Sequence, residues 1–150
     1  MPRDSQASPA PSDSAARAET LKALLARSQA EFEVEFYESI LASHPAYPEV
    51  LSILGQLLTN LGNHQRALAI DRMHAQIRPT QPVVLYNLAC SQSLCGQLEE
   101  ALDTLKVAVA HGYDDLEHLG ADPDLYPLHD YPPFIQWFAE QTLPDMPRYC

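Results

Sequence analysis

The sequence predicts an all-α fold: a short solenoid of about three helical hairpins, closed by a C-terminal capping segment. Three observations predict it. One pattern is written twice at a spacing of 34 residues, apolar residues within each copy recur at helical spacing, and glycine or proline stands where each helix should end. A repeat of this length is typical of a helix–turn–helix unit, which buries its apolar face by stacking on its neighbours.

The two copies of the repeat cover about residues 48–81 and 82–113. Their identities fall where a helical hairpin needs small or apolar residues. The identical positions are Pro48, Leu51, Leu54, Gly62, Ala67 and Leu68, which recur as Pro82, Leu85, Leu88, Gly96, Ala101 and Leu102. The apolar spacing predicts helices near 49–61, 64–77, 82–95 and 98–111.

Glycine and proline mark the expected helix ends. Gly62 and Gly96 are predicted to end the first helix of each copy, because glycine tolerates the left-handed conformation that follows a helix. Pro79 and Gly112 are predicted to end the second helices. Small residues are predicted where two helices approach closely, because a larger side chain would push them apart; these residues are Gly55, Ala89, Ala67 and Ala101.

This pattern resembles that of the tetratricopeptide repeat (TPR) family. The matching residues are Leu54-Gly55, Leu88-Ala89, Ala67, Ala101 and Pro79. The aromatic residues usual in the family are absent: Leu51 and Leu85 replace them in the first helices, and Asp71 and Leu105 in the second. The resemblance covers residues 48–113 and implies a non-enzymatic scaffold or adaptor, whose first helices line a concave groove for a partner protein.

The segments before and after the repeats complete the expected domain. Residues 1–16 are rich in proline, serine and alanine and are expected to be a disordered tail. The helical domain is expected to cover residues 17–142. Its irregular first unit, residues 18–47, is predicted to contain one helix near 18–43, since neither glycine nor proline interrupts that range. Residues 143–150 are expected to be a loose tail.

Residues 114–142 are predicted to cover the open end of the last hairpin. They resemble the end-of-group segment that closes some bacterial TPR arrays. The matching residues are Gly112-Tyr113-Asp114, Leu119, Asp122-Pro123-Asp124-Leu125, Leu128 and Pro133-Phe134. The residues expected to cover the hairpin are Leu125, Leu128, Phe134 and Phe138. Asp122 is expected to cap the turn that begins at Pro123.

Charge and cysteine content restrict the class of partner and the compartment. The net charge of −11 argues against binding to nucleic-acid phosphates and is compatible with a basic partner. The three cysteines form no Cys-x-x-Cys motif, and the N-terminus has no signal-peptide pattern, so we expect a reducing cytoplasm. No stretch is long and apolar enough to span a membrane, so no membrane partner is expected.

The sequence contains no catalytic constellation, and we expect no enzyme activity, no metal and no cofactor. His111, Asp115 and His118 could share a helix face, but Gly112 interrupts that helix. Cys90 has no base near it in the sequence and is expected to be a small buried or groove-lining residue.

The resemblance also implies where a partner would bind. The groove-facing positions are Glu49, Ser52, Ile53, Gln56, Asn60, Val83, Tyr86, Asn87, Cys90 and Leu94. Tyr86 would offer an aromatic face to a partner side chain, and Asn87 an amide to its backbone. An ordinary exposed helix surface is an equally good interpretation of these two residues. The expected ligand is a peptide or helix of a partner protein with an apolar or basic contact segment.

Two other functions fit the same sequence. Small acidic TPR proteins of similar length serve as secretion chaperones in bacteria, and a regulatory accessory subunit of an enzyme would use the same scaffold. The capping segment favours the scaffold or adaptor, whereas the acidic charge and the length allow the chaperone. The sequence leaves the partner's identity and the oligomeric state open.

Overall fold

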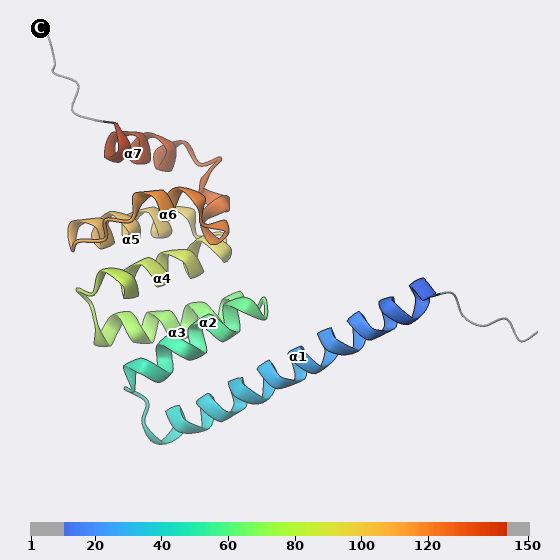
Figure 1. Ribbon diagram of the computed structural model, residues 1–150. Coiled ribbons are helices and arrows are strands. Elements are labelled where there is room, and N and C mark those ends of the chain that lie inside the picture. Colours follow the sequence, from blue (N-terminus) through green and yellow to red (C-terminus); the bar gives the residue numbers. More distant parts are fainter. Residues whose placement is uncertain (1–10, 144–150) are drawn as a thin grey trace, which may run out of the picture.

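The computed structural model describes residues 11–143, and these residues form helices without any strand. The helices are α1 (Pro11–Ser43), α2 (Pro48–Asn60), α3 (His64–Ile77), α4 (Pro82–Leu94), α5 (Leu98–Ala110), α6 (Leu116–Ala121), the 3-10 helix η1 (Pro123–Leu128) and α7 (Pro132–Thr142). The all-α prediction is confirmed. Helices α2 and α3 form one hairpin, α4 and α5 form the next, and the two stack through α3 and α4 (Figure 1).

Glycine ends three of the helices in the same way. Gly62, Gly96 and Gly112 all have positive φ, at 77°, 76° and 108°. After α2, the Gly62 N–H donates to the Thr59 carbonyl and the Asn63 N–H donates to the Leu58 carbonyl. This is the paired hydrogen-bond pattern that glycine allows at a helix C-terminus, and it confirms the predicted stops.

The apolar core is divided between the two hairpins. One cluster joins α1, α2 and α3 through Val34, Leu41, Val50, Leu51, Leu54, Leu58 and Ala67. The other joins α4, α5 and the capping segment through Tyr86, Ala89, Cys90, Ala101, Leu102, Leu105, Leu119, Leu125, Leu128 and Phe134. The side chains of Ala67 and Ala101 are fully buried, as the predicted close helix crossings require.

The capping segment covers the last hairpin as predicted. Helix η1 packs against α4 and α5, and its residues Leu125 and Leu128 are fully buried. Phe134 at the start of α7 is also buried. Phe138 is partly buried and stacks on Phe134, with 5.7 Å between the ring centroids. These residues extend the core of the α4–α5 hairpin to the C-terminal end of the stack.

Helix α1 takes the place of the irregular first unit and is one continuous helix. Val34 and Leu41 in its second half pack in the core with α2, whereas its first half extends away from the stack (Figure 1). The helix begins at Pro11 rather than near Ala18, so residues 11–16 of the expected disordered tail are helical. The rest of that tail, and residues 144–150 of the expected C-terminal tail, lie outside the described residues.

Candidate functional site

A cavity of about 220 Å³ opens between α2, α3, α4 and the start of the capping segment. Its lining residues come from all of these elements: Ser52, Gly55, Gln56, Thr59, Asp71, Tyr86, Asn87, Cys90, Ser91, His118, Asp122 and Asp124. Three are aspartates, and none of the lysines or arginines of residues 11–143 lines the cavity. We call it the acidic cavity.

Asp71 is the most deeply buried carboxylate of the acidic cavity, with 6% of its surface exposed. It projects from α3 toward α2 and α4. The Ser91 hydroxyl donates a hydrogen bond of 2.5 Å to Asp71 Oδ2. On the other side, a Cβ placed on Gly55 would lie 2.5 Å from Asp71 Oδ1. Gly55 is therefore the residue of α2 that leaves room for this carboxylate.

Burial changes the acidity of Asp71. The loss of solvent raises the pKa of its carboxyl group from 3.8 to about 6, although the hydrogen bond from Ser91 acts in the opposite direction. The group is thus mainly ionised at neutral pH but takes up a proton in mildly acidic solution. A cation beside it would stabilise the ionised form.

Asp122 connects the capping segment to α4. Its Oδ1 accepts a hydrogen bond of 3.0 Å from the Asp124 N–H, which confirms that Asp122 caps the turn beginning at Pro123. Its Oδ2 accepts a hydrogen bond of 2.6 Å from the Tyr86 hydroxyl and lies 3.3 Å from His118 Nε2. One carboxylate thus orders the turn and holds the cap against the first helix of the second hairpin.

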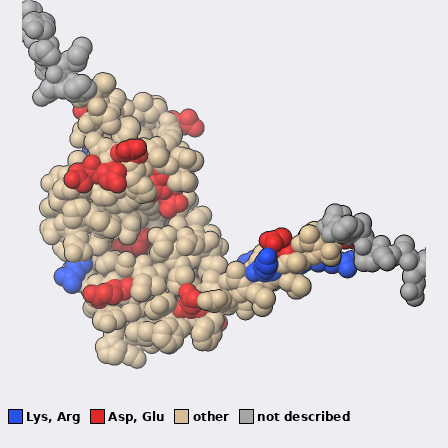
Figure 2. Space-filling model, viewed as in Figure 1, with Lys and Arg blue, Asp and Glu red and all other residues tan. Residues whose placement is uncertain are grey.

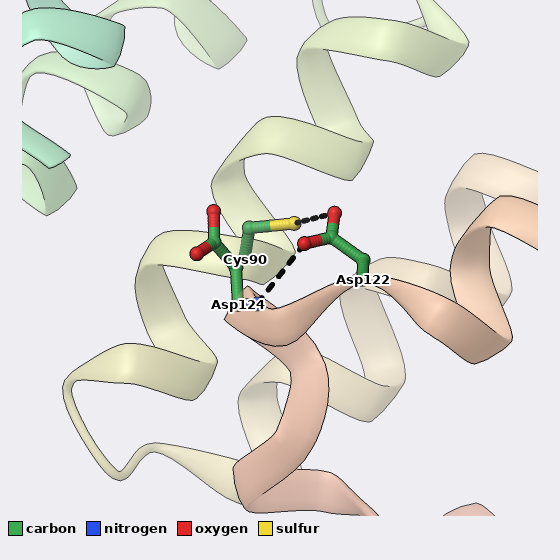
Figure 3. A group of neighbouring side chains, drawn as sticks. All are labelled: Cys90, Asp122 and Asp124. Carbon is green, nitrogen blue, oxygen red and sulfur yellow. Dashed lines mark hydrogen bonds between the residues drawn. The ribbon is translucent and has the colours of Figure 1, made fainter. Parts of the chain in front are cut away.

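Cys90 of α4 lies beside Asp122 and Asp124 at the start of η1 (Figure 3). One possible ligand atom from each of the three residues lies within 4.8 Å of the others, which is a spacing that a metal ion could bridge. However, burial and the two neighbouring carboxylates raise the pKa of the Cys90 thiol. Because both metal binding and nucleophilic attack require the thiolate, this environment disfavours both.

His111, Asp115 and His118, which the sequence analysis considered as possible metal ligands, have other places in the structure. The Asp115 carboxylate accepts a hydrogen bond of 2.9 Å from the His118 N–H and so caps α6. His118 lies at the edge of the acidic cavity, while His111 is exposed at the end of α5. These three residues therefore do not share one helix face.

Half of the predicted groove residues line the acidic cavity. They are Ser52, Gln56, Tyr86, Asn87 and Cys90. The others lie outside it. Glu49 borders a separate depression near His74 and Arg78, and Val83 is 62% exposed at the start of α4. Asn60 accepts a hydrogen bond from the Gln56 amide, Ile53 is exposed, and Leu94 is half-buried.

Tyr86 cannot play the role that the sequence suggested. Its side chain is only 5% exposed, because its ring stacks on Tyr113 with centroids 4.3 Å apart and planes 3° from parallel. Burial and the hydrogen bond to Asp122 also raise the pKa of its hydroxyl. The ring is part of the core between α4 and the cap. The prediction that Tyr86 offers a free aromatic face to a partner is therefore wrong. Asn87, half-buried beside it, still reaches the cavity.

The sequence prediction missed the acidic residues of the cavity. Asp71 carried a usable signal, since an aspartate stands where the repeat expects a large apolar residue, opposite a glycine. Asp122 was identified only as a helix cap. Its contact with Tyr86 spans 36 residues of sequence and depends on how the cap folds back over α4.

In the view of Figure 2, acidic side chains gather over α6 and its neighbouring loops.

Comparison with known proteins gives a partial similarity to a plant protein. No family model matches the chain. The chain is similar to a chloroplastic protein from Arabidopsis thaliana, with 36% identity over 88 residues. The match covers 55% of this chain and 26% of that protein, so the chain spans about a quarter of the relative's length. Within residues 11–143, no helix is long and apolar enough to cross a membrane.

Proposed function

We propose that this chain is a TPR-like protein-interaction module that binds a segment of a partner protein across α2 and α4, with a lysine or arginine side chain of that segment in the acidic cavity. The observation that carries the proposal is the composition of the cavity. Asp71, Asp122 and Asp124 converge there, and no lysine or arginine of the described chain lines it.

The electrostatics favour a cationic ligand group. Burial removes solvation from both Asp71 and Asp124 and raises the pKa values of their carboxyl groups. The charge of Asp122 also raises the pKa of Asp124, while His64 lowers it. An ammonium or guanidinium group in the cavity would form charge-assisted hydrogen bonds with these oxygens. Such bonds contribute about 1.5–3 kcal/mol each, more than bonds between neutral groups.

The size of the cavity fits one side chain. Sites for small-molecule substrates and cofactors usually measure about 300–1,000 Å³. The acidic cavity, at about 220 Å³, has room for the end of one long side chain. Gln56 and Asn87 at its edge offer amide groups to the backbone of an extended segment, which is the way a groove holds a peptide.

Binding is a better use of this site than catalysis. The pKa values of the Cys90 thiol and the Tyr86 hydroxyl are both raised, so neither group is prepared to act as a nucleophile or a base at neutral pH. The proposal therefore includes no enzymatic activity. It also keeps the reducing cytoplasm expected from the cysteines, while the name of the plant relative places that protein in the chloroplast.

The test is selection of random peptides displayed on phage against the immobilised full-length chain. Peptides that bind the wild-type protein should be enriched in lysine or arginine at one position. The Asp71→Asn variant keeps the size of the side chain and an acceptor for Ser91 but lacks the charge, so it should lose that enrichment. Asp103→Asn removes the same charge from an exposed position on α5 and is the matched control.

Two outcomes would contradict the proposal. One is a selection that yields only acidic or uncharged peptides. The other is equal enrichment of basic peptides by the wild type and the Asp71→Asn variant. For a selected peptide, affinity should also decrease as the pH falls from about 7.5 to 5, because Asp71, with a pKa of about 6, then loses its charge.

A further inference from the structure

Helix α1 carries a stripe of exposed apolar side chains that runs from its first half into its second. Leu21, Leu24, Leu25, Phe32 and Phe36 are 61%, 59%, 72%, 68% and 52% exposed. Leu24 and Leu25 follow Leu21 by three and four residues, Phe32 follows Leu25 by seven, and Phe36 follows Phe32 by four, which places all five on one face of the helix. We call these five residues the α1 stripe. Large apolar side chains gathered on one face, rather than scattered singly, indicate an interaction surface.

The α1 stripe does not face the rest of the molecule. Val34 and Leu41 are the α1 residues buried in the core with α2. Val34 follows Phe32 by two residues, and two residues turn an α-helix by about 200°, so the stripe lies on the opposite side. Residues 13–29 are exposed, and this half of the helix extends away from the stack (Figure 1). Most of the stability of a helix in a protein comes from packing of its apolar face, and the α1 stripe is an apolar face without such packing in the single chain.

The basic residues of α1 are confined to one half of the helix. Arg17, Lys22 and Arg27 all lie in its first half, together with Asp13 and Glu19, so positive charges exceed negative ones there by one. Its second half contains only acidic charges, Glu31, Glu33, Glu35 and Glu38. Blue side chains in Figure 2 lie mostly on this projecting helix. The ion pairs that these basic residues make, Arg17–Asp13, Lys22–Glu19 and Arg27–Glu31, are exposed and lie within α1, so each contributes little to stability.

We infer that the α1 stripe binds the α1 stripe of a second copy of this chain, with the two helices antiparallel. In that arrangement the half of each helix that contains its basic residues lies beside the acidic half of the other. A parallel pair would instead place the four glutamates of one second half beside those of the other, where they repel.

The positions of the apolar residues fit the same arrangement. An antiparallel pair centred next to Ser28 sets Leu21 beside Phe36 of the second copy and Leu25 beside its Phe32. The small side chain of Ser28 lies on the same face, where the two helices cross, and allows them to approach closely. The interface is therefore self-complementary, as a twofold-symmetric dimer requires. This inference does not depend on the proposed ligand of the acidic cavity, which lies on other helices.

The first experiment is sedimentation velocity on the full-length chain over a range of concentrations. We expect a reversible dimer, which dissociates more readily in 0.5 M salt than in 0.05 M salt because the charges are exposed. The Leu25→Glu/Phe32→Glu double variant should weaken dimerisation at least tenfold. Both side chains are exposed, so the variant should keep its helical circular dichroism. Val107→Glu, which changes an exposed apolar residue of α5, is the matched control and should dimerise like the wild type.

Disulfide formation tests the orientation. In a background of Cys95→Ser and Cys150→Ser, a mixture of Leu21→Cys and Phe36→Cys chains should form a cross-linked heterodimer. Each variant alone should not cross-link, because two copies of position 21 would lie roughly 20 Å apart. A chain that stays monomeric at all concentrations, a double glutamate variant that dimerises normally, or cross-linking of Leu21→Cys with itself would overturn the inference.

Discussion

The two hairpins follow one pattern but differ where their helices cross. In the second hairpin, Ala89 and Leu105 are fully buried in one apolar cluster. At the equivalent positions, 34 residues earlier, the first hairpin has Gly55 and Asp71. Asp71 is almost as buried as Leu105, and its carboxylate occupies the space that the missing Cβ of Gly55 leaves. The same scaffold thus contains an apolar crossing in one hairpin and a charged one in the other.

The difference shows where function can enter a repeat protein. Positions that agree between the two copies form helix ends and core, and their role is structural. The departure at Gly55 and Asp71 creates a polar surface beside α4, and the cap adds Asp122 and Asp124 to it. A buried carboxylate is costly for stability unless it is paired. We interpret the unpaired, buried carboxylate as part of a binding site, in which a cationic group of a partner would pair with it.

The largest expected effect on stability comes from a substitution in the apolar cluster of the second hairpin. Tyr86→Ala should lower the free energy of unfolding by about 3–5 kcal/mol, since it removes a buried ring and leaves the Asp122 carboxylate without its hydroxyl partner. Urea denaturation of both proteins measures it. Tyr126→Ala, at a tyrosine of η1 that is 53% exposed, is the control and should cost little. A Tyr86→Ala variant as stable as the wild type would mean that the cap does not pack on α4.

The second expected effect is a pH-dependent change in stability caused by Asp71, at the helix crossing of the first hairpin. The pKa of Asp71 is higher in the folded than in the unfolded chain, so its contribution to stability is complete below about pH 4 and is lost as the pH rises through about 6. The neutral Asp71→Asn variant does not undergo this loss. It should therefore be more stable than the wild type above pH 6, by on the order of 2–3 kcal/mol.

Thermal or urea unfolding from pH 4 to 8 tests this prediction. The stability advantage of Asp71→Asn over the wild type should grow between pH 4 and 6 and then stay constant. Asp103→Asn, at an exposed position, should follow the wild type throughout. If Asp71→Asn were the less stable protein at pH 7.5, the carboxylate would be stabilised in the folded chain and the cavity would already contain its cation.

The scaffold could be predicted from the sequence, but most of the site could not. The ends of α2 to α5 agree with the predicted ranges to within one residue, because glycine at the left-handed position and proline at a helix start are local signals. The start of α1 was placed too late, since its first turns carry proline, serine and alanine, a composition also typical of disordered tails.

The site depends on contacts that local patterns do not encode. Tyr86 has the position of a groove residue in its own repeat, but Tyr113, at the end of the second copy, and Asp122, in the capping segment, cover it. Asp71 was visible as a departure from the repeat. Its closeness to Gly55 and Ser91 became clear only when three helices were placed together. The periodicity of the sequence therefore predicts the helices of each repeat but not the contacts between the capping segment and α4.

A smaller effect on stability tests the contact between Gly55 and Asp71, which distinguishes the first hairpin from the second. Gly55→Ala should destabilise the protein by about 1–3 kcal/mol, because the new Cβ meets the Asp71 carboxylate. Adding Asp71→Leu should remove most of that cost, since alanine and leucine already pack together at the equivalent positions, Ala89 and Leu105. A double-mutant cycle from urea denaturation measures this coupling. Purely additive changes would show that Gly55 and Asp71 do not constrain each other.

The smallest expected effect is on binding alone. Asn87→Ala should weaken a peptide selected on the wild-type chain by about 1–2 kcal/mol, because the amide at the edge of the cavity would no longer contact the peptide backbone. Isothermal titration calorimetry provides the affinity, and the melting temperature should change little. Lys106→Ala on the exposed side of α5 is the control. Equal losses from both variants would place the peptide elsewhere.

The most direct measurement is an NMR titration of the Asp71 carboxyl group in the free chain and with a selected lysine-containing peptide. We predict a pKa of about 6 in the free protein, assigned by its absence from Asp71→Asn, and a markedly lower pKa when the peptide is bound. A carboxyl group that titrates near 4 in the free chain, or one whose pKa the bound peptide leaves unchanged, would contradict the account that the acidic cavity receives a cation.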